Sequence, residues 1–224
     1  MKRKLLYVAV AAASFIAFVS CSSEYHKGVD FERDVHITDL LTIKRAETGE
    51  VYFQYRNLKL LPSIECNYEL PQRALASLTI SPNKIDGYNE CYVEWLEPLE
   101  KGAFKLSPSY TSPSSQAQGD GLDLLLDSSL TILEDGFLSL HYNTWWGEYP
   151  VHHDFTLICT GSAGNDYSFI LIQDSNGDSK YIQSEGIICF DVSSVPVTSE
   201  EQKTITLNWI KLDGSAGTAR FELE

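Results

Sequence analysis

The chain has 224 residues, of which 43% are hydrophobic and 12% aromatic. This content is high enough for a sizeable core and excludes a disordered chain, and the length suits two modest domains or one large β domain. The 31 acidic residues outnumber the 17 basic ones and give a formal net charge of −14. Such a charge repels nucleic acid, so nucleic-acid binding is rejected as a function.

The first 20 residues have the pattern of a secretory signal. Lys2, Arg3 and Lys4 form a basic cluster, and an apolar run of 15 residues follows at positions 5–19. A membrane-spanning helix needs about 20 apolar residues, and this run ends instead at small residues. We therefore predict a signal peptide at residues 1–20.

Cys21 is predicted to carry a lipid. Residues 18–21 read Phe-Val-Ser-Cys and resemble a bacterial lipobox, in which a small residue precedes the acylated cysteine. The alternative is an ordinary signal peptide cut near Ser20, which would leave Cys21 as a free thiol. Lipidation is favoured, because a free thiol at the cleavage point would be a coincidence.

The predicted lipoprotein is anchored to a membrane and does not span it. Several acyl chains hold a protein stably, since each buried methylene contributes about 0.8 kcal/mol, and residues 21–33 form a short tether behind them. This places the protein in the cell envelope, and it leaves open whether the chain faces the periplasm or the cell exterior. Cleavage removes three basic residues and no acidic one, so the formal charge becomes −17.

A first β domain is predicted at residues 34–121. Short runs rich in β-branched and aromatic residues are separated by Gly, Pro, Asn and Asp, which is typical of strands and turns. The expected strands lie at 35–45, 50–61, 75–80, 91–96 and 102–106. Residues 71–77 are the one short helix candidate. Residues 107–121 are rich in Ser, Thr and Pro and predict a linker or long loop at the end of this domain.

A second β domain is predicted at residues 122–224. Eight strands are expected, at 129–133, 137–143, 154–160, 167–173, 179–182, 187–192, 204–211 and 218–223. Gly-containing turns separate several of them. Eight strands in about a hundred residues indicate an antiparallel β-sandwich, although the order of the strands does not follow from the pattern.

Three segments of the second domain carry a family resemblance. They read Leu-Glu-Asp-Gly-Phe-Leu-Ser-Leu-His-Tyr at 133–142, His-His-Asp-Phe-Thr-Leu-Ile at 152–158 and Gly-Ile-Ile-Cys-Phe-Asp-Val-Ser-Ser at 186–194. Together with the leader and the two β domains, they resemble the NigD-like lipoproteins of Gram-negative anaerobes. The resemblance implies an all-β chain with a small OB-like barrel followed by a β-sandwich. It implies no catalytic residues, and its immunity-type role is an analogy, because a fold does not fix a function.

Four cysteines follow Cys21, and an oxidising compartment permits them to form disulfides. They are Cys66, Cys91, Cys159 and Cys189. In a two-domain chain, the pairing that stays within each domain joins Cys66 to Cys91 and Cys159 to Cys189. Four buried free thiols are the equally open alternative. Metal binding by these cysteines is not expected, since no C-x-x-C pair occurs.

Asp174, Asn176 and Asp178 place oxygen atoms at alternate positions, as calcium loops do, and are weak metal candidates. The Asn-Gly pair between two β runs favours a hairpin turn instead. His152 and His153 are neighbours on an expected strand, so their side chains point to opposite faces and cannot share one metal. No metal and no cofactor is predicted.

Residues 142–149 are the most unusual stretch. Tyr142, Trp145, Trp146 and Tyr149 lie beside a glycine and a proline, which predicts a loop or hairpin tip. Exposed Tyr and Trp rings stack on sugars and also form hot spots in protein interfaces. The alternative is that one of the two tryptophans plugs the end of the sandwich core.

Motifs of common enzymes are absent from the sequence, so we expect no catalysis. The first functional hypothesis is a cell-envelope lipoprotein that acts as a protein-interaction module, accessory or immunity-like. The second is a glycan-binding surface lipoprotein that uses the aromatic residues at 142–149. Expected partners are the membrane, through the lipid anchor, and an envelope protein or a glycan. A third, hydrolytic hypothesis requires a cleft with two facing carboxylates.

Overall fold

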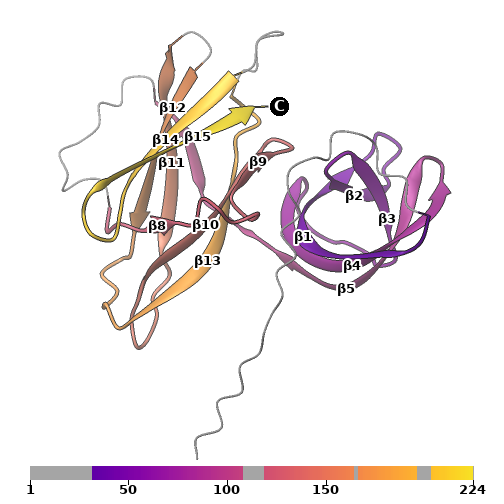
Figure 1. Cartoon of the computed structure of the whole chain (residues 1–224), viewed down its shortest axis with the longest axis horizontal. Helices are drawn as coiled ribbons and strands as arrows, with labels where there is room; N and C mark the ends of the chain where they lie inside the picture. The colour runs from indigo at the N-terminus through magenta and orange to yellow at the C-terminus, as the bar shows by residue number, and fades with distance from the viewer. Residues whose placement is uncertain (1–31, 108–118, 164–165, 196–202, 224) are drawn as a thin grey trace, which may run out of the picture.

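The computed structural model describes residues 32–107, 119–163, 166–195 and 203–223. The predicted signal peptide, Cys21 and nearly all of the tether lie outside these residues, as does most of the expected linker. The described residues form an all-β chain in two parts, as predicted (Figure 1). They contain no helix that is long and apolar enough to cross a membrane.

The first part is a closed five-stranded barrel. Its strands are β1 (Val35–Arg45), β2 (Val51–Tyr55), β3 (Leu58–Pro62), β4 (Gln72–Ile85) and β5 (Tyr88–Pro98). They follow the order β1-β2-β3-β5-β4 around the barrel, and β4 closes it against β1. The β3–β5 pair is parallel and the other pairs are antiparallel. This confirms the predicted small OB-like barrel.

Alternating side chains fill the barrel, because successive strand residues point to opposite faces. The interior contains Leu41, Ile43, Phe53, Tyr55, Leu60, Cys66, Ala74, Ala76, Leu78, Ile80 and Cys91. The expected helix at 71–77 is wrong, because these residues begin β4. Ala74 and Ala76 both point into the barrel, and this period of two outweighs the helical preference of alanine.

The second part is a β-sandwich, again as predicted (Figure 1). One sheet has the order β6-β13-β10-β8, with β9 paired to β10, and the other has the order β15-β14-β12-β11-β7. The strands are β6 (Glu100–Lys101), β7 (Ala103–Leu106), β8 (Asp123–Leu124), β9 (Ile132–Glu134), β10 (Phe137–Trp146), β11 (Asp154–Ala163), β12 (Asp166–Asp174), β13 (Ile182–Asp191), β14 (Lys203–Ile210) and β15 (Ala216–Leu223). Most pairs are antiparallel, but β6–β13, β7–β11 and β12–β14 are parallel.

The sandwich begins earlier in the chain than the composition suggests. Residues 100–106 lie before the expected boundary at 121, yet β6 pairs with β13 and β7 pairs with β11. The chain crosses from one sheet to the other at Gly102, where a Cβ atom would lie 2.2 Å from the Phe190 ring. The structural boundary therefore lies at Leu99, before the polar run that begins at residue 107.

The turn after β12 also differs from expectation. Asn176 and Gly177 have the positive φ angles expected of an Asn-Gly turn, and the Asp178 N–H donates to the Ser175 carbonyl at 3.0 Å. However, β12 and β13 belong to different sheets, so the turn connects two layers and forms no hairpin. The expected strand at 179–182 is wrong, because β13 begins only at Ile182.

An apolar cluster joins the barrel to the sandwich. Its buried members are Leu40, Leu99, Phe137 and Cys189, and Leu75, Leu130, Ile132 and Ile187 pack against them. Its members on β10 and β13 are Phe137, Ile187 and Cys189. They alternate with the residues of the sandwich core and therefore lie on the outer face of the sheet. The outer face of this sheet is therefore covered by the barrel at one end.

Two ion pairs reinforce this junction. The Arg73 side chain on β4 is 1% exposed, and its Nη2 atom lies 2.6 Å from Oε2 of Glu134. Its Nη1 atom donates to the Thr42 hydroxyl at 2.8 Å. The second ion pair joins Lys44 on β1 to Asp135, the residue that follows Glu134. Glu134 ends β9 and Asp135 follows it in the β9–β10 turn, so the barrel holds this part of the sandwich in place.

Replacement of Glu134 by alanine is expected to destabilise the protein by about 3 kcal/mol. The change leaves the buried Arg73 guanidinium without its opposite charge, and loss of one partner of a buried pair typically costs about 3–5 kcal/mol. The lower value applies because the Glu134 side chain is partly exposed. Urea unfolding, followed by tryptophan fluorescence, measures the change.

Glu69→Ala, which removes an exposed carboxylate of the barrel, is the matched control. It should change the free energy of unfolding by less than about 0.5 kcal/mol. Equal stability of the Glu134→Ala and Glu69→Ala variants would contradict a structural role for the Arg73–Glu134 pair.

Candidate functional site

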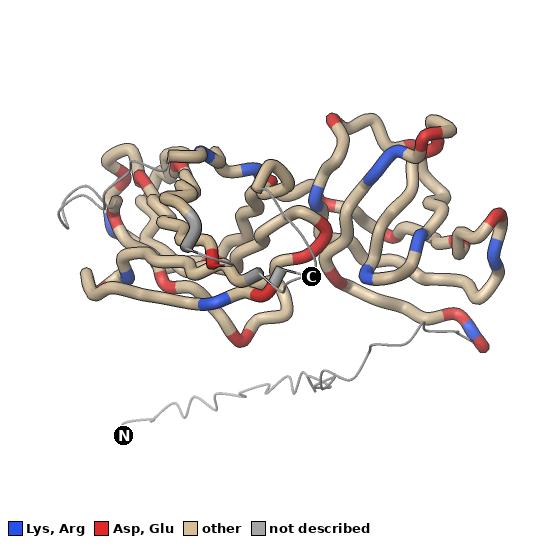
Figure 2. Tube along the Cα trace, turned by 90° about the horizontal axis from the view of Figure 1, so that it is seen from above, with Lys and Arg blue, Asp and Glu red and all other residues tan. Residues whose placement is uncertain are grey.

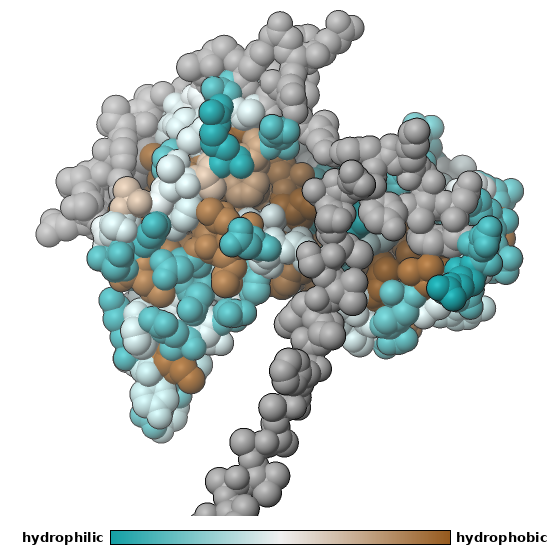
Figure 3. Space-filling view, viewed as in Figure 1, coloured by the Kyte–Doolittle hydropathy of each residue, from teal (hydrophilic) through white to brown (hydrophobic). Residues whose placement is uncertain are grey.

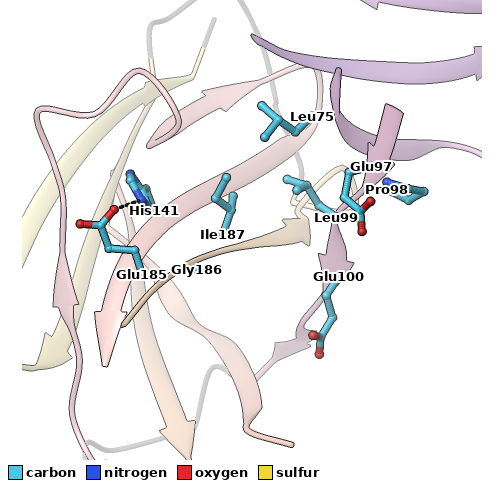
Figure 4. Close-up of a pocket in the computed structure, with 9 residues that line it drawn as sticks. All are labelled: Leu75, Glu97, Pro98, Leu99, Glu100, His141, Glu185, Gly186 and Ile187. Carbon is cyan, nitrogen blue, oxygen red and sulfur yellow. Dashed lines mark ion pairs between the residues drawn. The ribbon is translucent and has the colours of Figure 1, made fainter. Parts of the chain in front are cut away.

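A groove of about 440 Å³ lies where the barrel meets the sandwich. Its lining comes from β4 and the end of β5 in the barrel, the segment that leads into β6, and β10 and β13 of the sandwich (Figure 4). The lining residues are Leu75, Glu97, Pro98, Leu99, Glu100, His141, Glu185, Gly186 and Ile187. We call this feature the junction groove.

The floor of the junction groove is apolar. Leu75, Leu99 and Ile187 line it, and all three belong to the cluster that joins the two parts of the chain. Figure 3 shows apolar atoms on the sandwich close to this junction. The contact that holds the domains together therefore also forms the floor of the groove.

The rim of the junction groove is acidic. Glu97 lies on the barrel side, whereas Glu100 on β6 and Glu185 on β13 belong to the sandwich, and the lining residues include no Lys or Arg (Figure 4). Asp and Glu recur along the trace of both parts (Figure 2). Acidic side chains around an apolar concave surface focus a negative potential, which attracts cationic groups.

His141 forms part of the sandwich wall of the groove. Its Nε2 atom lies 3.1 Å from Oε2 of Glu185, and its Nδ1 atom lies 2.8 Å from Oγ of Ser128. Both ring nitrogens are engaged, so the imidazole is fixed in orientation. We interpret His141 as a positioned wall residue that holds Glu185 at the rim.

A second groove, of about 600 Å³, continues from the first. Glu100 lines both grooves, and the second is also lined by Lys101, Lys105 and Asp154. His152 stands beside it, with Nε2 at 3.4 Å from Glu100 and 3.6 Å from Asp154. The two grooves therefore meet at Glu100, and the second carries both acidic and basic residues.

The aromatic residues at 142–149 do not form one exposed loop. Residues 142–146 belong to strand β10, so their side chains alternate between the two faces of the sheet. Tyr142 points into the sandwich core, where its ring packs over Gly186. Trp146 packs against the same core and stacks on His153 at 4.1 Å between ring centroids. The expectation of a loop is wrong for these residues.

Trp145 and Tyr149 have different positions from the other two aromatic residues. Trp145 points to the outer face of the sheet, where it is partly exposed, and Tyr149 follows the strand with 83% of its surface exposed. The expectation that one tryptophan packs against the end of the core therefore applies to Trp146. A nearby glycine and proline indicated a loop, but the strand continues to Trp146 through ten residues paired with β13.

Asp178 uses its oxygens to hold the loop that follows β10. Its Oδ2 atom accepts the Gly147 N–H at 2.9 Å and the Val151 N–H at 3.3 Å. The same oxygen lies 3.2 Å from Nε2 of the buried His153, whose Nδ1 accepts from the Gln173 amide at 2.8 Å. These hydrogen bonds lower the pKa of the Asp178 carboxyl below its ordinary range, and the bond from the Gly147 N–H has the largest effect.

The three weak metal candidates are not brought together. Asp174 accepts the Asn176 N–H at 2.8 Å, and the Asn176 amide donates to Asp154 at 2.9 Å. Asp178 is occupied as described above. Within the described ranges, no group of three or more His, Cys, Asp or Glu side chains could hold a metal ion.

The four cysteines are free thiols, and all four are buried. Cys66 and Cys91 lie together in the barrel core. Cys159 points into the sandwich core, whereas Cys189 faces the barrel and donates to the Glu100 carbonyl at 3.3 Å. The expected Cys159–Cys189 pairing is therefore wrong, because a sheet separates the two side chains. Burial raises the pKa of Cys91 and of Cys189 to about 12.

The residues of the junction groove were not found from the sequence. They come from positions 75, 97–100, 141 and 185–187, and the fold alone brings them together. No local motif marks them. The only available signal was the alternation in residues 137–143, which places His141 on the face opposite to Leu138 and Leu140.

Comparisons with known proteins agree with this architecture. The family profile described as the NigD-like C-terminal beta sandwich domain matches residues 118–223. No curated protein matches the chain.

Solved structures share both parts of the fold. A candidate toxin-related protein from Parabacteroides distasonis is 18% identical, with a TM-score of 0.65, over 85% of this chain and 94% of the other. A NigD-like immunity protein from Bacteroides caccae is 15% identical, with a TM-score of 0.57, over 84% and 96%. A candidate lipoprotein from Bacteroides fragilis is 12% identical, with a TM-score of 0.56, over 85% and 98%. At such identities the similarity shows a shared fold.

The Asp178→Asn variant is expected to be less stable than the original protein, in a way that depends on pH. The lowered pKa of Asp178 means that folding favours its carboxylate form. This contribution is present above the ordinary Asp pKa of about 4 and is lost as the pH falls through the lower value of the folded state. The two proteins should therefore differ clearly in urea midpoint at about pH 6, and the difference should shrink as the pH falls below about 4.

Asp127→Asn, which alters an exposed carboxylate, provides the control and should differ little from the original protein at either pH. A constant difference between the original protein and the Asp178→Asn variant across this range would show that the charge of Asp178 does not stabilise the loop.

Proposed function

Because this chain belongs to the NigD-like family, we propose that it is a non-catalytic lipoprotein of the cell envelope that binds another protein. Its role is accessory or immunity-like. Structures of the same fold include a NigD-like immunity protein and a candidate lipoprotein, which supports this class of function. The observation that carries the proposal is the junction groove.

The composition of the junction groove suits a protein partner. An apolar centre surrounded by a polar, solvated rim is the usual anatomy of a protein interface. Trp95 lies two residues before Glu97 on β5, on the same face of the strand, and is 45% exposed. Exposed tryptophan is enriched among the side chains that dominate binding energy. Outside the groove lining, the barrel therefore offers an exposed tryptophan close to Glu97 of the acidic rim.

The carboxylates around the groove are exposed to solvent. The general acid of a glycosidase is a carboxyl group kept protonated in an apolar site. The Glu100 and Glu185 side chains are 54% and 60% exposed, and Glu185 is paired with His141. These surroundings support a binding role over a hydrolytic one.

The proposed anchor at Cys21 would hold the groove close to a membrane. The 13 residues of the predicted tether at 21–33 reach at most about 45 Å when fully extended. The barrel begins at Val35, directly after this tether. The binding surface would therefore stay near the membrane, where membrane proteins and anchored proteins are the accessible partners.

Glycan binding is the second candidate, and Trp145 is the observation that supports it. Trp145 lies on the outer face of β10, four residues beyond His141 on the same face. An exposed indole ring can stack on a sugar. Only Trp145 and Tyr149 of the four aromatic residues at 142–149 are available for such contact, so the candidate rests on a smaller surface than the sequence suggested.

A photo-crosslinking residue in place of Glu97 is expected to capture one envelope protein. The full-length chain with its lipid anchor is produced in the cells to whose envelope it belongs. The matched control carries the photo-crosslinking residue in place of Arg220, which is exposed and distant from the groove. The captured protein should then bind the Glu97→Lys/Glu185→Lys variant at least about tenfold more weakly, a loss of about 1.4 kcal/mol. Binding is measured by biolayer interferometry with the chain from residue 22 onward, which lacks the lipid anchor.

Two results would contradict the groove as an interface. The first is a capture pattern that is the same at positions 97 and 220. The second is unchanged affinity of a variant that retains the urea midpoint of the original protein.

The glycan candidate is tested by tryptophan-fluorescence titration against a panel of envelope polysaccharides. A protein-binding role predicts no saturable change. A saturable change that disappears in Trp145→Ala, and that persists in the exposed control Tyr92→Ala, would favour the glycan-binding role instead.

A further inference from the structure

Strand β13 has one edge that is only partly used. On one side it pairs with β10 over its full length, from Ile182 to Asp191. On the other side it pairs with β6 at only two positions, Ile188 and Cys189. Among the described residues, no strand pairs with residues 182–187 on this second side.

The direction of the backbone groups on β13 follows from two hydrogen bonds. The Gly102 N–H donates to the Cys189 carbonyl at 2.9 Å, so Cys189 turns its backbone toward β6. The Val192 N–H donates to the Gly136 carbonyl at 2.9 Å, on the β10 side. Since these directions alternate along a strand, Gln183 and Glu185 turn their N–H and C=O groups toward the free edge.

The edge is open because the preceding chain leaves the sheet. A longer β6 would continue backwards from Glu100 along residues 183–187. Instead, the Leu99 N–H donates to the Arg73 carbonyl at 2.9 Å, and Leu99 packs into the barrel junction. The junction groove occupies the space beside Glu185, Gly186 and Ile187 (Figure 4).

The edge at residues 182–187 carries no Lys, no Pro and no bulge. Natural edge strands are blocked by Lys, Pro, bulges or covering segments. Residues 182–187 read Ile-Gln-Ser-Glu-Gly-Ile, and they pair with β10 without a bulge. Gln183, Ser184 and Glu185 are exposed. An open, regular edge beside an apolar groove is the arrangement that proteins use to bind extended segments by strand addition.

The charges around the edge select the occupant. Glu97, Glu100 and Glu185 surround the groove, and a net charge of −14 disfavours a second copy of this chain. An extended segment presents alternate side chains to one face, so apolar groups could contact Ile187 and Leu75 while basic groups reach the carboxylates.

Building on the proposed function, we propose that residues 183–187 of β13 form a strand-addition site. The occupant is an extended segment of the partner protein that carries Lys or Arg together with apolar residues. Backbone hydrogen bonds to Gln183 and Glu185 hold the segment, and the junction groove receives its side chains. The sandwich sheet thereby gains a strand from the partner.

The first test uses a displayed library of random peptides about nine residues long, which span the edge at about 3.3 Å per residue. Selection against the soluble chain from residue 22 onward should enrich basic, β-prone sequences. Amide hydrogen exchange, measured by NMR with a selected peptide, should slow at least tenfold at Gln183 and Glu185. The amides of Ser184 and Gly186 already bond to β10 and should be unchanged.

The second test removes one backbone donor. Glu185→Pro deletes the N–H that points to the free edge and leaves the pairing with β10 intact. Glu185→Ala removes the same carboxylate and keeps the N–H, so it is the matched control. The selected peptide should bind Glu185→Pro at least tenfold more weakly than Glu185→Ala. If Glu185→Pro does not fold, Gln183→Pro and Gln183→Ala near the start of the strand replace the pair.

Strand addition is overturned by a library that enriches no peptide, by peptides that protect neither Gln183 nor Glu185, or by equal affinity for the proline and alanine variants. If the crosslinker at position 97 still captures a partner, the groove remains a protein interface with another mode of binding. If both experiments fail, the proposed function fails together with the strand-addition site.

Discussion

Arg73 lies where the barrel meets the sandwich, with its charged group almost fully shielded from water. A buried charge is tolerated only when opposite charge and hydrogen bonds meet it, and here Glu134 of the sandwich supplies the charge while Thr42 of the barrel supplies a hydroxyl. Neither domain satisfies the guanidinium alone. The two parts are therefore held in one relative position, and a groove that takes its walls from both can keep a defined shape.

The path of the chain at Leu99 explains two features, the position of the domain boundary and the open edge of β13. Leu99 bonds to the backbone of Arg73 and packs into the junction, so the polypeptide enters the sandwich only at Glu100. Residues 100–106 then pair with both sheets in turn, which places the domain boundary before the polar run that follows. Because the chain arrives from the barrel, it cannot cover the first half of β13. The contact that fixes the domains also leaves the strand edge open.

Sequence patterns predicted the elements better than their partners. The strand at Val35–Arg45 has the predicted bounds, since alternation along one strand is a local property. The failures concern the choice of sheet: the Asn176–Gly177 turn has the expected backbone but connects two layers, and Cys159 and Cys189 lie on faces that cannot meet. The junction groove combines four distant segments, so no local pattern could mark it.

Charge and backbone contribute to recognition at different distances. In the proposed complex, the acidic rim attracts a basic segment before the two proteins touch, but at physiological salt this attraction extends only about 8 Å. It therefore governs mainly how fast and in which orientation a partner arrives. The apolar floor around Ile187 and the free N–H groups of β13 act only after contact, and such contacts set how long a complex lasts. An acidic surface alone would bind many basic proteins briefly, whereas the same surface beside an open strand edge can select a partner that presents an extended segment.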